Sequence, residues 1–284
     1  MPKINKFSNY ILVFAIFLAI FIWSTALNNV SADIEPNSAK ISFLDVGQGD
    51  AALISLPESK QILIDTGKSG KLVDKLNSKM PAFDREIEAV FLTHPDNDHT
   101  GSFENLVKDY KVDKVYYSWE GSKSESGKKV DELVEERKIS KITPAIGDNY
   151  YFSNLRLEVL WPPEKSGFSD NNSSLVMRAD LDGSRALFTG DVEIKGQEAM
   201  MRSAIDVSAD LLKVSHHGSS GAYNEYFLKK VGAKNAVISV GQNSYGHPGK
   251  IVLEGLRGLG ISVFRTDEKG TVDFVPSEKG WVKR

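Results

Sequence analysis

The sequence predicts a layered α/β fold in which two sheets pack face to face and helices cover their outer faces. Short apolar runs rich in β-branched residues alternate with runs of helical periodicity from residue 40 onward. This order of strands followed by helices occurs once in each half of the chain, and polar residues gather where the strand-like runs end. Two sheets of such strands would be buried by packing against each other.

The first half supplies six strand-like runs and two clear helical runs. We expect strands at residues 41–46, 51–56, 61–64, 88–92, 112–118 and 155–161. We expect helices at residues 70–80 and 129–138, and a further helix with Phe103, Leu106 and Val107 on one face. Residues 121–129 are polar and rich in Ser and Lys, which predicts a loop.

The second half repeats the pattern. We expect strands at residues 174–181, 185–188, 211–214 and 236–240, and two short strands close to the C-terminus. We expect helices at residues 193–203, 224–231 and 250–259. Polar residues again gather where these strand-like runs end.

The composition is that of an ordinary globular protein and narrows its chemistry. The 284 residues are 41% hydrophobic and 26% charged, enough for one large core or two modest ones. The net charge of -3 gives no global basic field, so a polyanionic substrate would have to be held by metal and by local Lys or Arg. Cysteine is absent, which excludes disulfides, a thiolate nucleophile and a cysteine zinc site.

The N-terminus has the pattern of an export signal or membrane anchor. Lys3 and Lys6 precede residues 10–27, which carry no charge and are about long enough to span a bilayer. Small residues up to Ala32 offer a cleavage site. We therefore expect a signal or anchor at 1–32, a linker at 33–39 and a hydrolase domain at 40–284, membrane-anchored facing outside or secreted.

Residues 94–99 (HPDNDH) place two imidazoles and two carboxylates within one short segment after a buried strand. These side chains are typical ligands of a hydrolytic divalent metal. The alternative is a polar surface turn, because Asp and Asn favour turns. That alternative does not explain why two of the five histidines of the chain flank the carboxylates.

All five histidines follow strand-like runs, which favours their convergence in one site over independent surface positions. They are His94, His99, His216, His217 and His247. Asp191 also ends a strand and could bridge two metals, although it could equally cap the helix that follows. Asp45, Asp50 and Asp65 are expected to orient the ligands or simply to form turns.

These motifs resemble the metallo-β-lactamase fold, in the form found in the ComEC family of late-competence DNA-uptake proteins. The resemblance rests on residues 44–50, 63–67, 94–99, 171–176, 188–191, 216–219 and 245–248, in family order. It implies an αββα four-layer sandwich and a metal-dependent hydrolase. Only one candidate membrane span is visible, so we expect a stand-alone form without the channel of the family.

The resemblance also implies a role for each residue of the motifs. His94 and Asp96 would bind one metal, Asp98 and His99 the second, and Asp191 would bridge them. His216 would join the second metal, with His217 as the alternative. His247 would bind phosphate or donate a proton. We therefore expect catalytic roles for Asp98, His217 and His247, and substrate contacts from Asn172, Ser174, Ser219 and Tyr245.

Three positions depart from the commoner pattern of the superfamily. Asp96 stands where a His is usual, residues 171–174 replace the third-motif His, and Ser102 replaces a Gly. Oxygen donors in place of imidazoles make the first site harder and suit Mn²⁺ or Mg²⁺ better. The expected cofactors are two divalent ions, zinc or manganese.

The leading hypothesis is a phosphodiesterase or nuclease that acts on single-stranded DNA with water activated by two metals. Lys213, Lys250 and Arg265 could contact backbone phosphate, although such side chains are usually only solvated. The alternatives are a hydrolase of a lactone, another ester or a cell-envelope phosphodiester, and a non-catalytic DNA-binding module. The sequence indicates no protein partner.

Overall fold

The structure is a computed structural model that describes residues 14–19, 39–68, 70–119, 122–162 and 170–284. The chain divides into two units, Met1–Pro36 and Asn37–Arg284. Residues 14–19 form a short exposed helical segment. No helix within the described ranges is long and apolar enough to cross a membrane. The rest of the predicted 1–32 segment, and all but the last residue of the 33–39 linker, lie outside those ranges.

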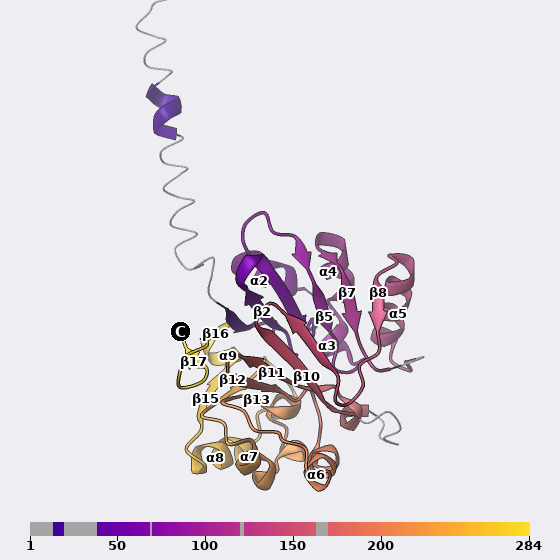
Figure 1. Cartoon of the computed structure of the whole chain (residues 1–284), viewed down its shortest axis with the longest axis vertical. Coiled ribbons are helices and arrows are strands. Elements are labelled where there is room, and N and C mark those ends of the chain that lie inside the picture. The colour runs from indigo at the N-terminus through magenta and orange to yellow at the C-terminus, as the bar shows by residue number, and fades with distance from the viewer. Residues whose placement is uncertain (1–13, 20–38, 69, 120–121, 163–169) are drawn as a thin grey trace, which may run out of the picture. The chain divides into compact units, whose positions relative to one another are not determined.

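The second unit contains two large sheets (Figure 1). The first has the order β17-β16-β1-β2-β3-β5-β7-β8, with β17 (Val282–Lys283), β16 (Val272–Val275), β1 (Lys40–Phe43), β2 (Ala52–Leu56), β3 (Lys60–Ile64), β5 (Ala89–Phe91), β7 (Lys114–Tyr116) and β8 (Ser140–Ile142). The second has the order β15-β14-β13-β12-β11-β10-β9, with β15 (Ser262–Arg265), β14 (Asn235–Ile238), β13 (Leu211–Lys213), β12 (Ser184–Phe188), β11 (Val176–Leu181), β10 (Leu155–Trp161) and β9 (Asn149–Phe152). A small pair joins β4 (Glu86–Ile87) to β6 (Lys111–Val112).

The helices are short and lie between the strands in the sequence. They are α2 (Leu72–Lys79), α3 (Asn97–Thr100), α4 (Phe103–Asp109), α5 (Glu125–Glu136), α6 (Ile194–Arg202), α7 (Glu225–Val231), α8 (Lys250–Gly258) and α9 (Thr266–Lys269). Single 3₁₀ turns occur at η1 (Pro57–Ser59), η2 (Asp170–Ser173), η3 (Ser215–Gly218) and η4 (Ser220–Ala222).

Three separate hydrophobic cores show that the unit has four layers. One core lies between the sheets, where Phe43 of β1 stacks on Phe188 of β12 with ring centroids 5.8 Å apart. A second core joins the outer face of the first sheet to α2, α4 and α5, and a third joins the outer face of the second sheet to α6, α7 and α8. The predicted arrangement of helix, sheet, sheet and helix is therefore confirmed.

Helix α5 corrects one prediction from the sequence. It begins at Glu125, inside the segment 121–129 that was expected to be a loop. Ser124 explains the early start, because its Oγ accepts a hydrogen bond from the Gly127 backbone N–H at 2.9 Å and caps the helix. The short strands β8 and β9 were not predicted, and both are partly exposed sheet-edge segments with weak apolar patterning.

The parallel strands of the two sheets end next to the residues that were expected to bind metal. In the first sheet β3 and β5 are parallel, and in the second sheet β12, β13 and β14 are parallel. Asp65 follows β3, His94 follows β5, Asp191 follows β12 and His217 follows β13. Because the carboxyl ends of parallel strands share one edge, the sequence motifs meet although they lie far apart along the chain.

Candidate metal centre

His99 is fixed by a buried hydrogen-bond network at the edge of the first sheet. Its Nδ1 lies 2.8 Å from Oδ2 of Asp65. The carboxylate of Asp65 also accepts hydrogen bonds from the backbone N–H and the hydroxyl of Thr93, at 2.7 and 2.8 Å. With Nδ1 occupied by Asp65, Nε2 faces inward and lies 3.3 Å from Oδ1 of Asp191. A carboxylate that orients imidazole in this way is a common support for a metal ligand.

His217 is held in the same manner from the second sheet. Its Nδ1 lies 2.8 Å from the carbonyl oxygen of Ser239 and 3.3 Å from Oδ1 of Asp50. Its Nε2 lies 3.2 Å from Oδ2 of Asp98 and 3.5 Å from Oδ2 of Asp191. Nε2 of His217 is therefore directed at the same region as Nε2 of His99.

His94 completes the inward-facing imidazoles. Its Nδ1 lies 3.2 Å from the hydroxyl of Thr93. Its Nε2 lies 3.9 Å from Oδ2 of Asp191 and 3.8 Å from Oδ2 of Asp96. The ring centroids of His94 and His99 are 4.0 Å apart. Two imidazoles this close, with their nitrogens turned toward one carboxylate, match the donor set of a divalent cation.

The unsatisfied polar atoms show that these residues fit a metal. The Nε2 atoms of the three inward histidines and Oδ1 of Asp191 are buried and have no hydrogen-bond partner. Buried polar atoms are normally paired, so an unpaired set aimed at one point indicates a ligand. Among the described residues, four groups of three have donor atoms within 4.8 Å of one another. Two of them, the outer donor groups, are His94 with His99 and Asp191, and Asp98 with His99 and His217, and the other two contain Asp50. These histidine and aspartate groups are able to hold divalent metal.

The doublet that follows β13 separates into an inner and an outer histidine. His216 and His217 both adopt left-handed backbone angles, with φ of 49° and 51°. The side chain of His217 is buried, whereas that of His216 is partly exposed and places Nδ1 3.3 Å from Oε1 of Glu193. Nε2 of His216 is 3.7 Å from Oδ2 of Asp191, but His216 is in neither of the donor groups named above.

Asp96 lies at the outer margin of the cluster. Its side chain is 54% exposed, and Asp96 belongs to none of the close donor groups found among the described residues. It remains near His94 at 3.8 Å, so a small rotation would be needed for both to bind one ion. The donor group around His94 is fully buried, so Asp96 would have to reach it from its outer side.

Imidazolium and carboxylate charges lie close together in the cluster and shift the pKa values of the histidines. Burial disfavours the imidazolium of His217, but Asp191 and Asp50 outweigh burial and raise its pKa to about 9. Burial is likewise outweighed at His99, where Asp191 and Asp65 raise the pKa well above its usual value. Burial, followed by the charge of His99, lowers the pKa of His94 to about 3. In the metal-free protein at neutral pH, two imidazoles carry the protons that balance the carboxylates, and metal would replace them.

The pKa values of the carboxylates move in two directions: that of Asp65 rises, whereas those of Asp191 and Asp98 fall. Burial raises the pKa of Asp65, against the lowering effect of His99. At Asp191 burial is outweighed by His217 and His99, which hold its pKa well below the usual value. At Asp98 burial is outweighed by the close imidazole of His217, followed by the charge of His99, and these lower its pKa. The carboxylates that face the inward imidazoles are therefore ionised and ready to bind a cation.

The metallo-β-lactamase superfamily model matches residues 44–242, which include the inward histidines and the aspartates around them. The chain belongs to the metallo-β-lactamase superfamily. Its resemblance to the ComEC competence type is also confirmed. It is 31% identical over 256 residues to ComE operon protein 3 of Bacillus subtilis, covering 84% of this chain and 33% of that protein. It is 29% identical over 252 residues to competence protein ComA of Neisseria gonorrhoeae, covering 85% and 33%.

The chain spans about a third of the length of these curated relatives. Among solved structures it is similar to YhfI, a metallo-β-lactamase fold protein from Bacillus subtilis, with a TM-score of 0.57 and 15% identity. That match covers 84% of this chain and 100% of YhfI. At this identity the likeness shows the shared fold.

Two residues of the metallo-β-lactamase motifs that were expected to contact substrate have internal partners instead. Ser174 is fully buried, and its Oγ accepts a hydrogen bond from the Asp191 backbone N–H at 3.2 Å. Oδ1 of Asn172 accepts hydrogen bonds from the backbone N–H groups of Glu193 and Gly196, at 3.2 and 2.9 Å. Both contacts hold Asp191 and the start of α6 in place, so substrate contact is a poor fit for Ser174.

The other expected substrate residues lie toward solvent. Tyr245 is 73% exposed, and its ring centroid lies 5.7 Å from that of His247. The His247 ring in turn lies 5.4 Å from the ring of His216. Ser219 is partly exposed, and its Oγ accepts a hydrogen bond from the Gly221 backbone N–H at 3.2 Å. Tyr245 and His247 thus form an aromatic border on the His216 side of the metal centre.

Of the three aspartates that were expected to orient the ligands, two contact the inward histidines. Asp65 and Asp50 do so, as described above. Asp45 instead forms a turn, with Oδ1 accepting from the Gly47 backbone N–H at 3.2 Å and Oδ2 paired with Lys75 at 3.4 Å. For Asp45 the turn interpretation agrees better with its contacts.

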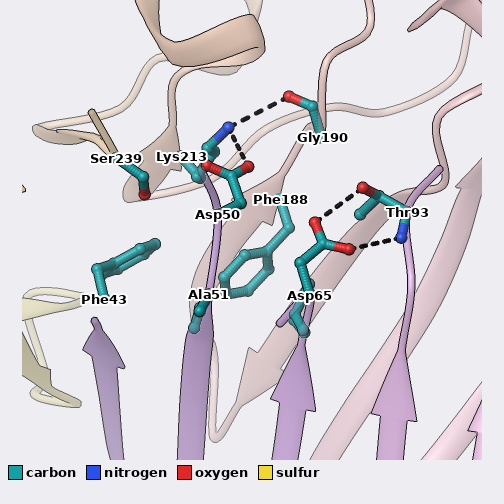
Figure 2. Close-up of a pocket in the computed structure, with 11 residues that line it drawn as sticks. Phe43, Asp50, Ala51, Asp65, Thr93, Phe188, Gly190, Lys213 and Ser239 are labelled. Carbon is teal, nitrogen blue, oxygen red and sulfur yellow. Dashed lines mark hydrogen bonds and ion pairs between the residues drawn. The ribbon is translucent and has the colours of Figure 1, made fainter. Parts of the chain in front are cut away.

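Lys213 is the residue of the centre whose role the sequence did not reveal. It was considered as a surface contact for phosphate, but its side chain is 3% exposed and forms an ion pair with Asp50 (Figure 2). The signal was present: Lys213 is the charged residue in the otherwise apolar run 211–214. A lysine in a central parallel strand requires a buried partner.

Proposed function

We propose that the protein is a metal-dependent phosphodiesterase that cleaves single-stranded DNA outside the cytoplasm. The observation that carries the proposal is the set of unpaired, inward-facing Nε2 atoms of His94, His99 and His217 around Asp191. Three imidazoles and ionised carboxylates in one buried cluster suit divalent ions, and hydrolysis of phosphate esters is a common use of such centres.

The residues would divide between two neighbouring metal positions. His94, His99 and Asp191 form one donor group, and Asp98, His99 and His217 form the other. Divalent ions bound there supply Lewis acidity toward a phosphoryl oxygen and make water a nucleophile at neutral pH. The protein holds the donors in place through Asp65 on His99 and through Ser239 and Asp50 on His217.

His247 is placed to bind the phosphate that enters this centre. Burial, followed by the charge of His216, lowers the pKa of His247, so its imidazole is neutral at physiological pH. Its Nδ1 is buried without a partner. A neutral ring in this position offers one N–H to a phosphate oxygen, and the proton-donating role would require the phosphate to raise its pKa first.

Two further observations favour DNA over other esters. The exposed ring of Tyr245 beside His247 offers a face on which a base can stack. A curated relative at 29% identity is named a competence protein, and competence is the uptake of DNA. A simple lactone has no base that could stack on this face.

The direct test is cleavage by the full chain after removal of metal with EDTA. The substrates are a 5′-labelled single-stranded oligonucleotide, its duplex, bis(p-nitrophenyl) phosphate and a simple lactone. We expect cleavage of the single strand when Mn²⁺ or Zn²⁺ is returned, and none without metal. The H94A variant should lose cleavage, whereas D45N, which changes a carboxylate outside the cluster, should keep it.

Three outcomes would contradict the proposal. Turnover of the lactone without cleavage of either phosphodiester would show an ester hydrolase. Binding of the oligonucleotide that persists in H94A, with no product from any substrate, would show a non-catalytic binding module. Equal cleavage with and without metal would exclude the metal centre as the catalyst.

The proposed location rests on the first 32 residues, with Lys3 and Lys6 before an uncharged apolar run. Protease added to intact cells should remove the hydrolase domain if it is anchored outside, and the culture medium should contain it if it is secreted. Protection of the domain until the cells are lysed would contradict both.

A further inference from the structure

A buried lysine lies beneath the metal centre. Lys213 is the last residue of β13, and its side chain rises from the strand toward the loops that carry Asp50 and Gly190 (Figure 2). The rings of Phe43 and Phe188 lie on the other side of this pocket. The void that remains among these side chains is about 10 Å³, room for one water at most. The ammonium is therefore paired by protein groups rather than hydrated.

The partners of this ammonium are supports and ligands of the metal centre. Nζ of Lys213 forms an ion pair with Oδ2 of Asp50 and donates a hydrogen bond to the carbonyl oxygen of Gly190 at 3.3 Å. Oδ1 of Asp191 lies 3.8 Å from the same nitrogen. The other oxygen of Asp50 faces Nδ1 of His217 at 3.3 Å. Lys213 thus contacts Asp50 and Asp191, the two carboxylates that also face the inward histidines.

Asp50 could otherwise serve as a metal ligand. Two inner donor groups contain it, one with Asp65 and His99 and one with Asp191 and His217, and their donor atoms lie within 4.8 Å of one another. In both groups the carboxylate of Asp50 already forms an ion pair with the ammonium of Lys213. A cation fixed to the chain therefore occupies the place that a third divalent ion would need.

We propose that the ammonium of Lys213 is a fixed cation that prevents Asp50 from binding a divalent ion. Asp50 thus stays paired with His217, and divalent ions bind only at the outer donor groups. The inference rests on the metal centre of the proposed function but not on its substrate. It has two consequences. The fixed charge weakens the binding of divalent ions by repulsion, and it keeps the buried carboxylates neutralised when no metal is bound.

The test is a pair of variants with opposite expected effects on metal binding. K213M keeps an unbranched side chain that is one atom shorter and removes its charge, so we expect Zn²⁺ and Mn²⁺ to bind at least about tenfold more tightly. D50N removes the carboxylate and leaves the ammonium unpaired, so we expect about tenfold weaker binding. Both affinities are measured by competition with a chelator on the full chain, without substrate. The metal-to-protein ratio at saturation is read in the same experiment.

Matched controls separate charge from packing. K213R keeps the charge and should bind metal as the wild type does. Lys79 and Asp273 form another partly buried ion pair, at 2.7 Å and outside the metal cluster, so K79M and D273N should leave metal affinity unchanged. The thermal midpoint of metal-free K213M should fall because Asp50 loses its counter-charge, and the double variant D50N/K213M should recover it.

Weaker or unchanged metal binding in folded K213M would overturn the inference, because a merely structural lysine would loosen the centre together with D50N. If K213M does not fold, D50N is compared with D50N/K213M, and the double variant must bind metal more tightly. The proposed function is tested separately, and it would be contradicted if the wild type bound no metal or cleaved no phosphodiester. Tighter metal binding by K213M supports the inference whatever the substrate is.

Discussion

The Nε2 atom of His217 lies 3.2 Å from Oδ2 of Asp98, and this contact joins the loops of the two sheets. Asp98 belongs to α3, beyond the first sheet, and His217 to the turn after β13 in the second. His216, its neighbour, is turned outward to Glu193 at 3.3 Å. A metal bound where these loops meet would therefore have His217, the inner histidine of the doublet, as a ligand.

The two histidines should differ when each is removed. We expect H217A to weaken binding of Zn²⁺ by at least about 100-fold, because it deletes a donor that faces Asp98 and Asp191. H216A should weaken it by less than about tenfold, because that ring is partly exposed. Chelator competition on both variants measures the difference. The reverse order would assign the metal to His216.

Asp65 should control metal affinity without binding metal itself. It holds Nδ1 of His99 at 2.8 Å, and D65N replaces one accepting carboxylate oxygen by an NH₂ group, which only donates. We expect metal affinity to fall by about 10- to 100-fold, with the fold retained. D45N is the matched control, because Asp45 serves a turn and Lys75. Equal losses in the two variants would indicate a general charge effect rather than orientation of His99.

The sequence predicted the positions of the site better than its internal contacts. Each strand end that carries a motif could be found from apolar runs followed by polar residues. The structure brings donor atoms of Asp98, Asp191 and three of the histidines together in overlapping groups, each with its atoms within 4.8 Å of one another. Spacing along the chain cannot tell which histidine of a doublet faces inward, because that depends on the left-handed backbone at both positions. Lys213 was missed because its partner Asp50 comes from the other sheet.

Metal binding should strengthen with pH. Asp191 and Asp50 raise the pKa of His217 to about 9, against the effect of burial, so in the metal-free protein it holds a proton that metal must displace. The affinity for Zn²⁺ should therefore rise from pH 6 to about 9, by about tenfold per pH unit for each proton released, and then level off. Calorimetry in buffers of different ionisation enthalpy would count the protons.

The stability of the metal-free protein should change in the opposite direction. Because the pKa of His217 is higher in the folded state, its protonation stabilises the fold. This contribution is complete below the ordinary pKa of 6.5 and is lost as the pH rises through about 9. The thermal midpoint without metal should thus fall between pH 6.5 and 9, while the shift caused by added metal grows. A metal-induced shift that is constant over this range would contradict protonation of His217.

Tyr245 should contribute to the binding of nucleobases but not to the chemical step. Its ring is 73% exposed and lies beside His247, outside the buried cluster. We expect Y245A to raise KM for a single-stranded oligonucleotide by about tenfold or more, the usual value of one base stacked on an aromatic ring, and to leave kcat nearly unchanged. Y245F keeps the ring and should behave as the wild type does. Tyr226, exposed on α7, provides the matched control Y226A, and an equal effect of both changes would show that Tyr245 has no particular role.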